Sequence, residues 1–207
     1  MLSKEEEITR DAYNNIAGDW ASTLSEDFWQ EHYQRFLKYL PSGKVVDLGC
    51  GNGRDSYWLA KMGYDVVGVD ISQEMIRLSA AKNPGLKFYV KSFYELDFPK
   101  KSFDGFWAAN SLLHIPRKNL GTVLKNIKFI LRPGAVGFIS IKEGNGEKLS
   151  EWRQSGQKRY FIYYQQDDFA EILRRSGFEI LAMFKKPPVN GNQDVTFLIF
   201  YVKLAKK

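Results

Sequence analysis

A group of glycines near residue 50 has the spacing of a turn that could hold a nucleotide. Gly49, Gly51 and Gly53 follow the apolar run KVVDL and precede an amphipathic run, and such glycines let the backbone approach a ligand where a helix begins. The dinucleotide fingerprint requires a glycine at the sixth position, which, counted from Gly49, is Arg54. The turn therefore favours a nucleotide ligand other than a dinucleotide.

Two aspartates flank this turn and narrow the ligand further. Asp47 precedes the glycines, where its charge would repel a pyrophosphate and attract a cation. Asp70 ends the next apolar run, where a carboxylate can accept hydrogen bonds from both hydroxyls of a ribose. The pattern predicts a ligand with a ribose, a neighbouring positive group and no phosphate that needs a binding site of its own. S-adenosylmethionine has all three features.

Four other side chains could do chemistry. His114 is either a general base or a residue that packs at a strand–helix junction, and Glu143 follows an apolar run at the edge where ligands bind. Cys50 is the single cysteine, and we interpret it as a small buried residue because it lies within the glycine turn. His32 lies in an aromatic helical segment and is interpreted as structural. Two histidines and one cysteine make no plausible metal site.

Alternating strand-like and helical runs must position these residues. Residues 5–40 predict two or three helices ending before Pro41. The predicted strands then cover residues 44–48, 65–70, 86–90, 102–110 and 135–141, and the helices 54–62, 72–82 and 117–131. This alternation predicts an α/β fold with a parallel sheet covered by helices on both faces.

The C-terminal segment departs from the alternation. After a predicted helix at 166–177, strand-like runs at 178–186 and 194–203 are separated only by PPVNGNQ, which is too short for a crossover helix. The last two strands should therefore form a hairpin, with the seventh strand antiparallel in a mostly parallel sheet.

Composition sets broader limits on function. The chain has 207 residues and a net charge of +6, but its positive residues are scattered rather than gathered in a stripe. No apolar run approaches the roughly 18 residues of a membrane span, the N-terminus lacks the apolar segment of a signal peptide, and a single cysteine excludes an internal disulfide. We expect one domain over residues 1–207, a cytoplasmic location and no membrane span.

Four stretches together resemble class I S-adenosylmethionine-dependent methyltransferases: VVDLGCGNGRD, VGVDIS, FDGFWAANSLLHIP and LRPGAVGFISIKEG. The N-terminal AYNNIAGDWA is similar to the helical lid of their small-molecule branch, which includes methyltransferases of ubiquinone and menaquinone biosynthesis. The resemblance implies a Rossmann-like, seven-stranded sheet in the order 3-2-1-4-5-7-6 with strand 7 antiparallel. It also implies S-adenosylmethionine as cofactor and S-adenosylhomocysteine as product.

The resemblance further implies what individual residues do. The glycine turn would hold the methionine and ribose portions, Asp70 the ribose, and Tyr13 the cofactor carboxylate. Ser92 stands near the place where the family usually has an acidic residue on the adenine amine, which would leave that contact to the backbone. The candidate cofactor residues are Tyr13, Asp47, Gly49, Cys50, Gly51, Arg54, Asp70, Ile71, Met75, Ser92, Phe93, Ala109 and Asn110.

By the same resemblance, the chain divides into four parts. Residues 1–40 would be the helical lid, 41–142 the cofactor-binding core, 143–165 a loop on the substrate side, and 166–207 a helix and the terminal hairpin.

Transfer from a sulfonium mainly requires alignment of the acceptor, and an alcohol or phenol would also need a base, for which His114 and Glu143 are candidates. The motifs of adenine-amine, pyrimidine-carbon and protein-arginine methylation are absent from the sequence. A small-molecule acceptor is therefore the leading hypothesis. Methylation of tRNA or another RNA and a non-catalytic S-adenosylmethionine-binding protein are the alternatives, and the oligomeric state stays open.

Overall fold

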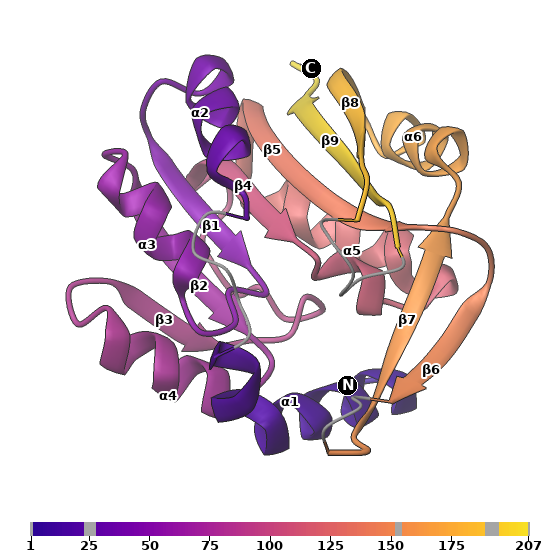
Figure 1. Cartoon of the computed structure of the whole chain (residues 1–207). Coiled ribbons are helices and arrows are strands. Elements are labelled where there is room, and N and C mark those ends of the chain that lie inside the picture. The colour runs from indigo at the N-terminus through magenta and orange to yellow at the C-terminus, as the bar shows by residue number, and fades with distance from the viewer. Residues whose placement is uncertain (1, 23–27, 152–154, 189–194, 207) are drawn as a thin grey trace.

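The computed structural model describes residues 2–22, 28–151, 155–188 and 195–206 (Figure 1). Its central sheet has the strand order β3-β2-β1-β4-β5-β9-β8. The strands are β1 (Lys44–Leu48), β2 (Asp65–Asp70), β3 (Lys87–Val90), β4 (Phe103–Ala109), β5 (Leu131–Glu143), β8 (Phe178–Lys186) and β9 (Phe197–Leu204). β1 to β5 pair in parallel, and β9 is antiparallel to both β5 and β8. The predicted order 3-2-1-4-5-7-6 is confirmed, with β9 as strand 7.

Helices cover both faces of this sheet, because its inner strands are apolar on both faces. On one face, α2 (Gln30–Tyr39) and α3 (Arg54–Lys61) pack around Trp107, which stacks on Phe138 of β5 with ring centroids 3.7 Å apart. On the other face, α5 (Arg117–Ile130) and α6 (Gln166–Arg175) bury their apolar stripes. The carboxyl ends of the parallel strands stay at one edge, between these layers.

Helix α4 (Gln73–Lys82) begins with a side-chain cap at that edge. The Ser72 hydroxyl oxygen accepts a hydrogen bond from the Met75 amide at 3.1 Å. The cap fixes the point where the chain leaves β2, directly after Asp70. The short 3-10 helix η1 (Leu112–His114) similarly follows β4 and connects it to α5.

The prediction of a loop over residues 143–165 was wrong for the backbone. This segment contains β6 (Glu147–Glu151) and β7 (Lys158–Tyr164), which pair in antiparallel fashion, and β7 also pairs in parallel with the last two residues of β5. The physical reason lies in the run KRYFIYY, whose aromatic and β-branched side chains favour a half-buried strand. The described residues beyond β5 therefore include a pair of antiparallel strands.

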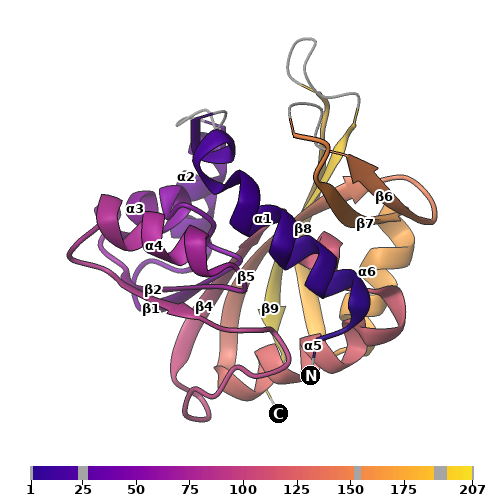
Figure 2. The same cartoon turned by 90° about the horizontal axis from the view of Figure 1, so that it is seen from below.

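The two N-terminal helices lie at different places relative to the sheet. Helix α1 (Lys4–Ser22) crosses the carboxyl edge of the sheet, from α4 at one end to β7 at the other (Figure 2). By contrast, α2 buries Tyr33 and Phe36 in the core against the sheet face. Of the two helices described in the region expected to be a lid, α1 lies over the edge and α2 does not. No helix within the described residues is long and apolar enough to cross a bilayer.

Candidate functional site

The glycine turn after β1 is tied to the end of β2. The amides of Gly49 and Cys50 both donate to the Val69 carbonyl oxygen, at 2.8 and 2.9 Å. Gly49 has φ +75°, and a Cβ there would lie 2.4 Å from Ser111 Cβ. Gly51 has φ +53°, and a Cβ there would meet no atom within 4 Å. Gly49 thus permits close packing of the turn, whereas Gly51 borders open space.

Asp70 lies directly beside this open space. Its carboxylate accepts hydrogen bonds from the amides of Gly51 and Ser72, each at 2.9 Å. Burial raises the pKa of Asp70, and the hydrogen bonds from the Ser72, Gly51 and Ile71 amides act in the opposite direction. The structure therefore brings Gly51, Asp70 and Ile71 together at one place, and their contacts with a cofactor stay predictions.

The Asp47 and Arg54 side chains are engaged within the protein. Asp47 is 1% exposed and accepts a 2.6 Å hydrogen bond from the Ser56 hydroxyl, and burial raises its pKa. Arg54 forms an ion pair with Asp55, with 2.6 Å between Nε and Oδ1. Asp55 also accepts a hydrogen bond from the Tyr33 hydroxyl. These contacts join the turn to α2 and α3. Contacts between the cofactor and Asp47 or Arg54 stay predictions.

The single cysteine is buried in the same turn. Cys50 is 7% exposed, and burial raises the pKa of its thiol. The interpretation of Cys50 as a small buried residue is confirmed. His32 is also buried, with Nδ1 2.8 Å from the Tyr201 hydroxyl, which agrees with a structural role.

The end of β4 leads through Asn110 to Ser111, which packs against the glycine turn. This residue has φ +55°, a left-handed conformation that asparagine tolerates better than most residues. Its amide donates to the Ser140 carbonyl oxygen at 3.1 Å, and the Ser140 hydroxyl donates to its Oδ1 at 2.9 Å. Ala109 is half-buried beside it. This geometry directs the chain from β4 to Ser111, against Gly49.

Three further candidate cofactor residues lie after β3 or in the first turn of α4: Ser92, Phe93 and Met75. The Ser92 hydroxyl oxygen accepts a 3.1 Å hydrogen bond from the Tyr94 amide, so it is engaged with its own loop. Phe93 and Met75 are buried at 9% and 1% exposure. Their side chains offer apolar surface and no charge.

A hydrogen-bonded chain fastens α1 to the rest of the site. The Tyr13 hydroxyl lies 3.1 Å from His114 Nε2, and His114 Nδ1 lies 2.6 Å from the Tyr160 carbonyl oxygen. A carbonyl oxygen only accepts, so Nδ1 carries the proton and Nε2 accepts from Tyr13. Arg159 donates to the Tyr13 hydroxyl oxygen at 3.3 Å. Burial lowers the pKa of His114 to about 3, so its ring is neutral at pH 7 with both nitrogens bonded.

The structure does not bring Glu143 to His114. Glu143 pairs with Lys185 of β8 at 2.5 Å, whereas its neighbour Lys142 lies 3.9 Å from the centroid of the Phe161 ring. Adjacent residues of a strand point to opposite faces, and the His114 ring is on the Phe161 side, 4.8 Å from that ring. The two candidate bases therefore belong to different surroundings.

Several residues of the site were missed from the sequence. Asn14 Oδ1 accepts from the Ser72 hydroxyl at 2.7 Å and so joins α1 to the start of α4. Lys142 and Arg159 lie around Phe161, and Arg159 also donates to the Tyr13 hydroxyl oxygen. The available signals were the position of Asn14 next to Tyr13 and the basic residue within the strand-like run RYFIYY.

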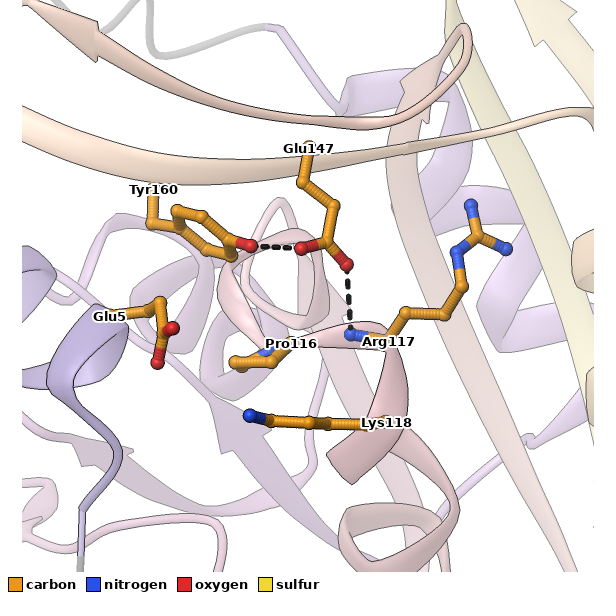
Figure 3. Close-up of a pocket in the computed structure, with 6 residues that line it drawn as sticks. All are labelled: Glu5, Pro116, Arg117, Lys118, Glu147 and Tyr160. Atoms are coloured by element: carbon orange, nitrogen blue, oxygen red, sulfur yellow. Dashed lines mark hydrogen bonds between the residues drawn. The ribbon is translucent and has the colours of Figure 1, made fainter.

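A separate cavity of about 430 Å³ opens on the outer side of this region (Figure 3). The Tyr160 hydroxyl donates to Glu147 across it, and the Arg117 amide donates to Glu147 Oε1 at 3.4 Å. It is lined by Glu5, Pro116, Arg117, Lys118, Glu147 and Tyr160. The residues predicted to hold a cofactor are not among these. Within the described part of the chain, no group of three or more His, Cys, Asp or Glu residues is arranged to hold a metal ion.

Comparisons with known proteins agree with this geometry. Residues 45–134 match the model of a methyltransferase domain. The chain is 29% identical over 173 residues to phosphoethanolamine N-methyltransferase 1 of Zea mays, covering 80% of this chain and 34% of that enzyme. It is 28% identical over 144 residues to the 2-methyl-6-phytyl-1,4-hydroquinone methyltransferase of Synechocystis, covering 66% of this chain and 45% of that protein.

A solved structure shows the same fold over the full length of the chain. The 1,6-didemethyltoxoflavin-N1-methyltransferase of Burkholderia thailandensis, with bound 1,6-didemethyltoxoflavin and S-adenosylhomocysteine, superposes with a TM-score of 0.79 at 22% identity. The match covers 100% of this chain and 92% of that one.

The two sequence relatives are longer proteins, since this chain spans about a third of the maize enzyme and less than half of the cyanobacterial one. The matched region nevertheless contains the glycine turn, Asp70 and the end of β4. The domain model, the relatives and the sheet order agree with one another. Residues 45–134 thus match a methyltransferase domain, and the chain is similar in sequence over that region, and in fold over its full length, to S-adenosylmethionine-dependent methyltransferases.

Proposed function

We propose that this chain transfers a methyl group from S-adenosylmethionine to a small-molecule acceptor. The observation that carries the proposal is the juxtaposition of Gly51 and Asp70 at the carboxyl edge of the sheet. The Gly51 amide and the Asp70 carboxylate are hydrogen-bonded at 2.9 Å beside space that a Cβ of residue 51 would enter. Ligands of open α/β sheets bind at this edge.

The residues present fit the cofactor. Asp70 keeps carboxylate lone pairs for the ribose hydroxyls, since the Gly51 amide donates to one of its oxygens and the Ser72 amide to the other, and a carboxylate has about four acceptor sites. Ile71 and Phe93 offer apolar surface for the adenine, and Ala109 and Asn110 lie where the methionine end would be. Ser92 supplies no carboxylate for the adenine amine, so the backbone after β3 would make that contact.

When bound, S-adenosylmethionine supplies a methyl group on a sulfonium, which is already an activated leaving group. The protein contributes to the transfer by aligning the acceptor with the methyl group and by excluding water. Helix α1 is suited to the second task because it crosses the edge and is fastened at Asn14, Tyr13 and Thr9. The Thr9 hydroxyl oxygen accepts from the Tyr160 amide at 3.1 Å.

His114 is better suited to positioning than to proton removal. A group with a pKa of about 3 is a weak base at neutral pH, and its Nε2 already accepts from Tyr13. Its hydrogen bonds join α1 to β7 through η1. Glu143 would have to leave Lys185 to act as a base. These contacts favour an acceptor atom that needs little help in losing its proton.

A small acceptor is favoured over RNA by two observations. The relatives named above are methyltransferases of phosphoethanolamine and of a hydroquinone, both small molecules. In addition, α1 lies across the edge where an RNA base would have to enter.

The test is transfer of a labelled methyl group from S-adenosylmethionine to panels of small amines, phenols, thiols and acids, with bulk tRNA in parallel. We expect label in at least one small-molecule class and none in tRNA, with Asp70→Ala as the cofactor-deficient control. Label in tRNA would favour the RNA alternative. Tight cofactor binding without transfer to any class would favour a non-catalytic binding protein.

A further inference from the structure

The hydroxyl of Ser111 is buried beside the glycine turn. Ser111 is 7% exposed, and its Oγ has no hydrogen-bond partner in the part of the chain that the structure describes. Ser111 stands at the cap position of η1, where a serine hydroxyl commonly accepts from a helix amide, but among the described residues it receives no such hydrogen bond. The hydroxyl therefore does not serve the helix that it precedes.

This hydroxyl differs from those of the other buried serines. A buried polar group without a partner is unfavourable, and each such group in a native protein requires an explanation. The four other serines that are buried in the described chain all donate within the protein: Ser56, Ser72, Ser79 and Ser140. A partner for Ser111 must come from a bound molecule.

Ser111 lies on the far side of the glycine turn from Asp70. It follows β4, the neighbour of β1 in the sheet (Figure 1), and its Cβ would lie 2.4 Å from a Cβ at Gly49. Asp70 ends β2, on the other side of β1. Two strand spacings, about 10 Å, separate β2 from β4. A ligand that has its ribose at Asp70 and its adenine beside Ile71 therefore extends along the turn toward Ser111.

We infer that the Ser111 hydroxyl forms a hydrogen bond with the amino-acid group of S-adenosylmethionine. A hydroxyl can donate to the carboxylate of that group or accept from its ammonium, and rotation about the Cα–Cβ bond turns it toward the ligand. With the ribose at Asp70, this contact would fix both ends of the cofactor and so the position of its sulfonium. The inference rests on the proposed function and adds a residue to its cofactor site.

The test compares S-adenosylhomocysteine with 5′-methylthioadenosine, which has the same adenine, ribose and thioether but no amino-acid group. Ser111→Ala should weaken the binding of S-adenosylhomocysteine about tenfold or more in calorimetric titration, because hydrogen bonds to charged groups are the stronger ones. The affinity for 5′-methylthioadenosine should not change. Unchanged binding of S-adenosylhomocysteine, or equal losses for the two ligands, would overturn the inference.

Unfolding in urea distinguishes this contact from a structural role. Alanine keeps the Cβ that packs against Gly49 and removes only the hydroxyl. Because a buried hydroxyl without a partner costs stability, the urea midpoint of the ligand-free Ser111→Ala chain should be unchanged or higher. A lowered midpoint would show that the hydroxyl supports the fold and would contradict the inference.

Ser79→Ala is the matched control, at the other end of the same turn. The Ser79 Cβ would lie 2.9 Å from a Cβ at Gly53, but its hydroxyl donates to the Ile76 carbonyl oxygen at 2.9 Å. This variant should bind both ligands as the unmodified chain does, and a selective loss of S-adenosylhomocysteine here would also contradict the inference.

The unmodified chain separates the inference from the proposed function. If the unmodified chain does not bind S-adenosylhomocysteine, the proposed function fails and the inference fails with it. If the unmodified chain and Ser111→Ala bind S-adenosylhomocysteine equally, the inference alone fails.

Discussion

Replacing Gly51 by alanine should separate cofactor binding from folding. Gly51 has φ +53°, so alanine there costs about 1–2 kcal/mol of folding free energy from left-handed backbone strain. No further cost arises from a clash, because the new Cβ meets no atom within 4 Å. The same methyl group would occupy space that we assign to the cofactor, next to Asp70. We expect the affinity for S-adenosylhomocysteine to fall at least tenfold, which is about 1.4 kcal/mol or more.

Gly63→Ala provides the matched control. Gly63 also has a positive φ, +92°, and a Cβ there also meets no atom within 4 Å, but it precedes β2 at the opposite edge of the sheet. Urea unfolding should give similar losses of stability for both variants, and calorimetric titration should show weakened binding only for Gly51→Ala. Equal affinities of the two variants for S-adenosylhomocysteine would refute the assignment of this space.

Three further predictions concern the site and its supports. Asp70→Ala removes charge-assisted hydrogen bonds and should weaken the binding of S-adenosylhomocysteine by about 1.5–3 kcal/mol in calorimetric titration. An unchanged Kd would contradict the assignment of Asp70 to the ribose. Tyr13→Phe removes the donor to His114 Nε2 and should lower the unfolding free energy by about 1 kcal/mol in urea titration, and no loss would count against this hydrogen bond. Burial lowers the pKa of His32 to about 4, so stability present above pH 6.5 should decline as the pH falls toward 4. At pH 5 the loss from His32 is about 2 kcal/mol, and His32→Gln should flatten the curve of unfolding free energy against pH; an equally steep curve would be the contrary result.

The strands, the antiparallel last pair and the glycine turn could be predicted because their signals are local, whereas the strand order followed from the resemblance to a known family. Apolar runs, the spacing of Gly49 and Gly51, the carboxylate of Asp70 and a short connection between the last two strands are all visible within short windows. The cap by Ser72 has the same local character. These features depend on neighbours along the chain, and the structure has each of them.

The remainder of the site depends on contacts between distant segments. Arg159 meets Tyr13 across a separation of 146 residues, and His114 meets Tyr13 across 101. The sequence gives no measure of burial for a single histidine, so it left both a base and a packing role open for His114. The β6–β7 hairpin was missed because its charged and glycine-containing flanks are typical of a loop, although the run around Phe161 favours a strand.

The central claim is that the edge formed by Gly51 and Asp70 binds S-adenosylmethionine rather than a dinucleotide. Calorimetric titration of the purified chain with S-adenosylhomocysteine, and separately with NADH, tests it most directly. We expect a one-to-one complex with S-adenosylhomocysteine at micromolar Kd and no heat of binding with NADH. Binding of NADH, or no binding of S-adenosylhomocysteine by a chain that unfolds cooperatively, would contradict it.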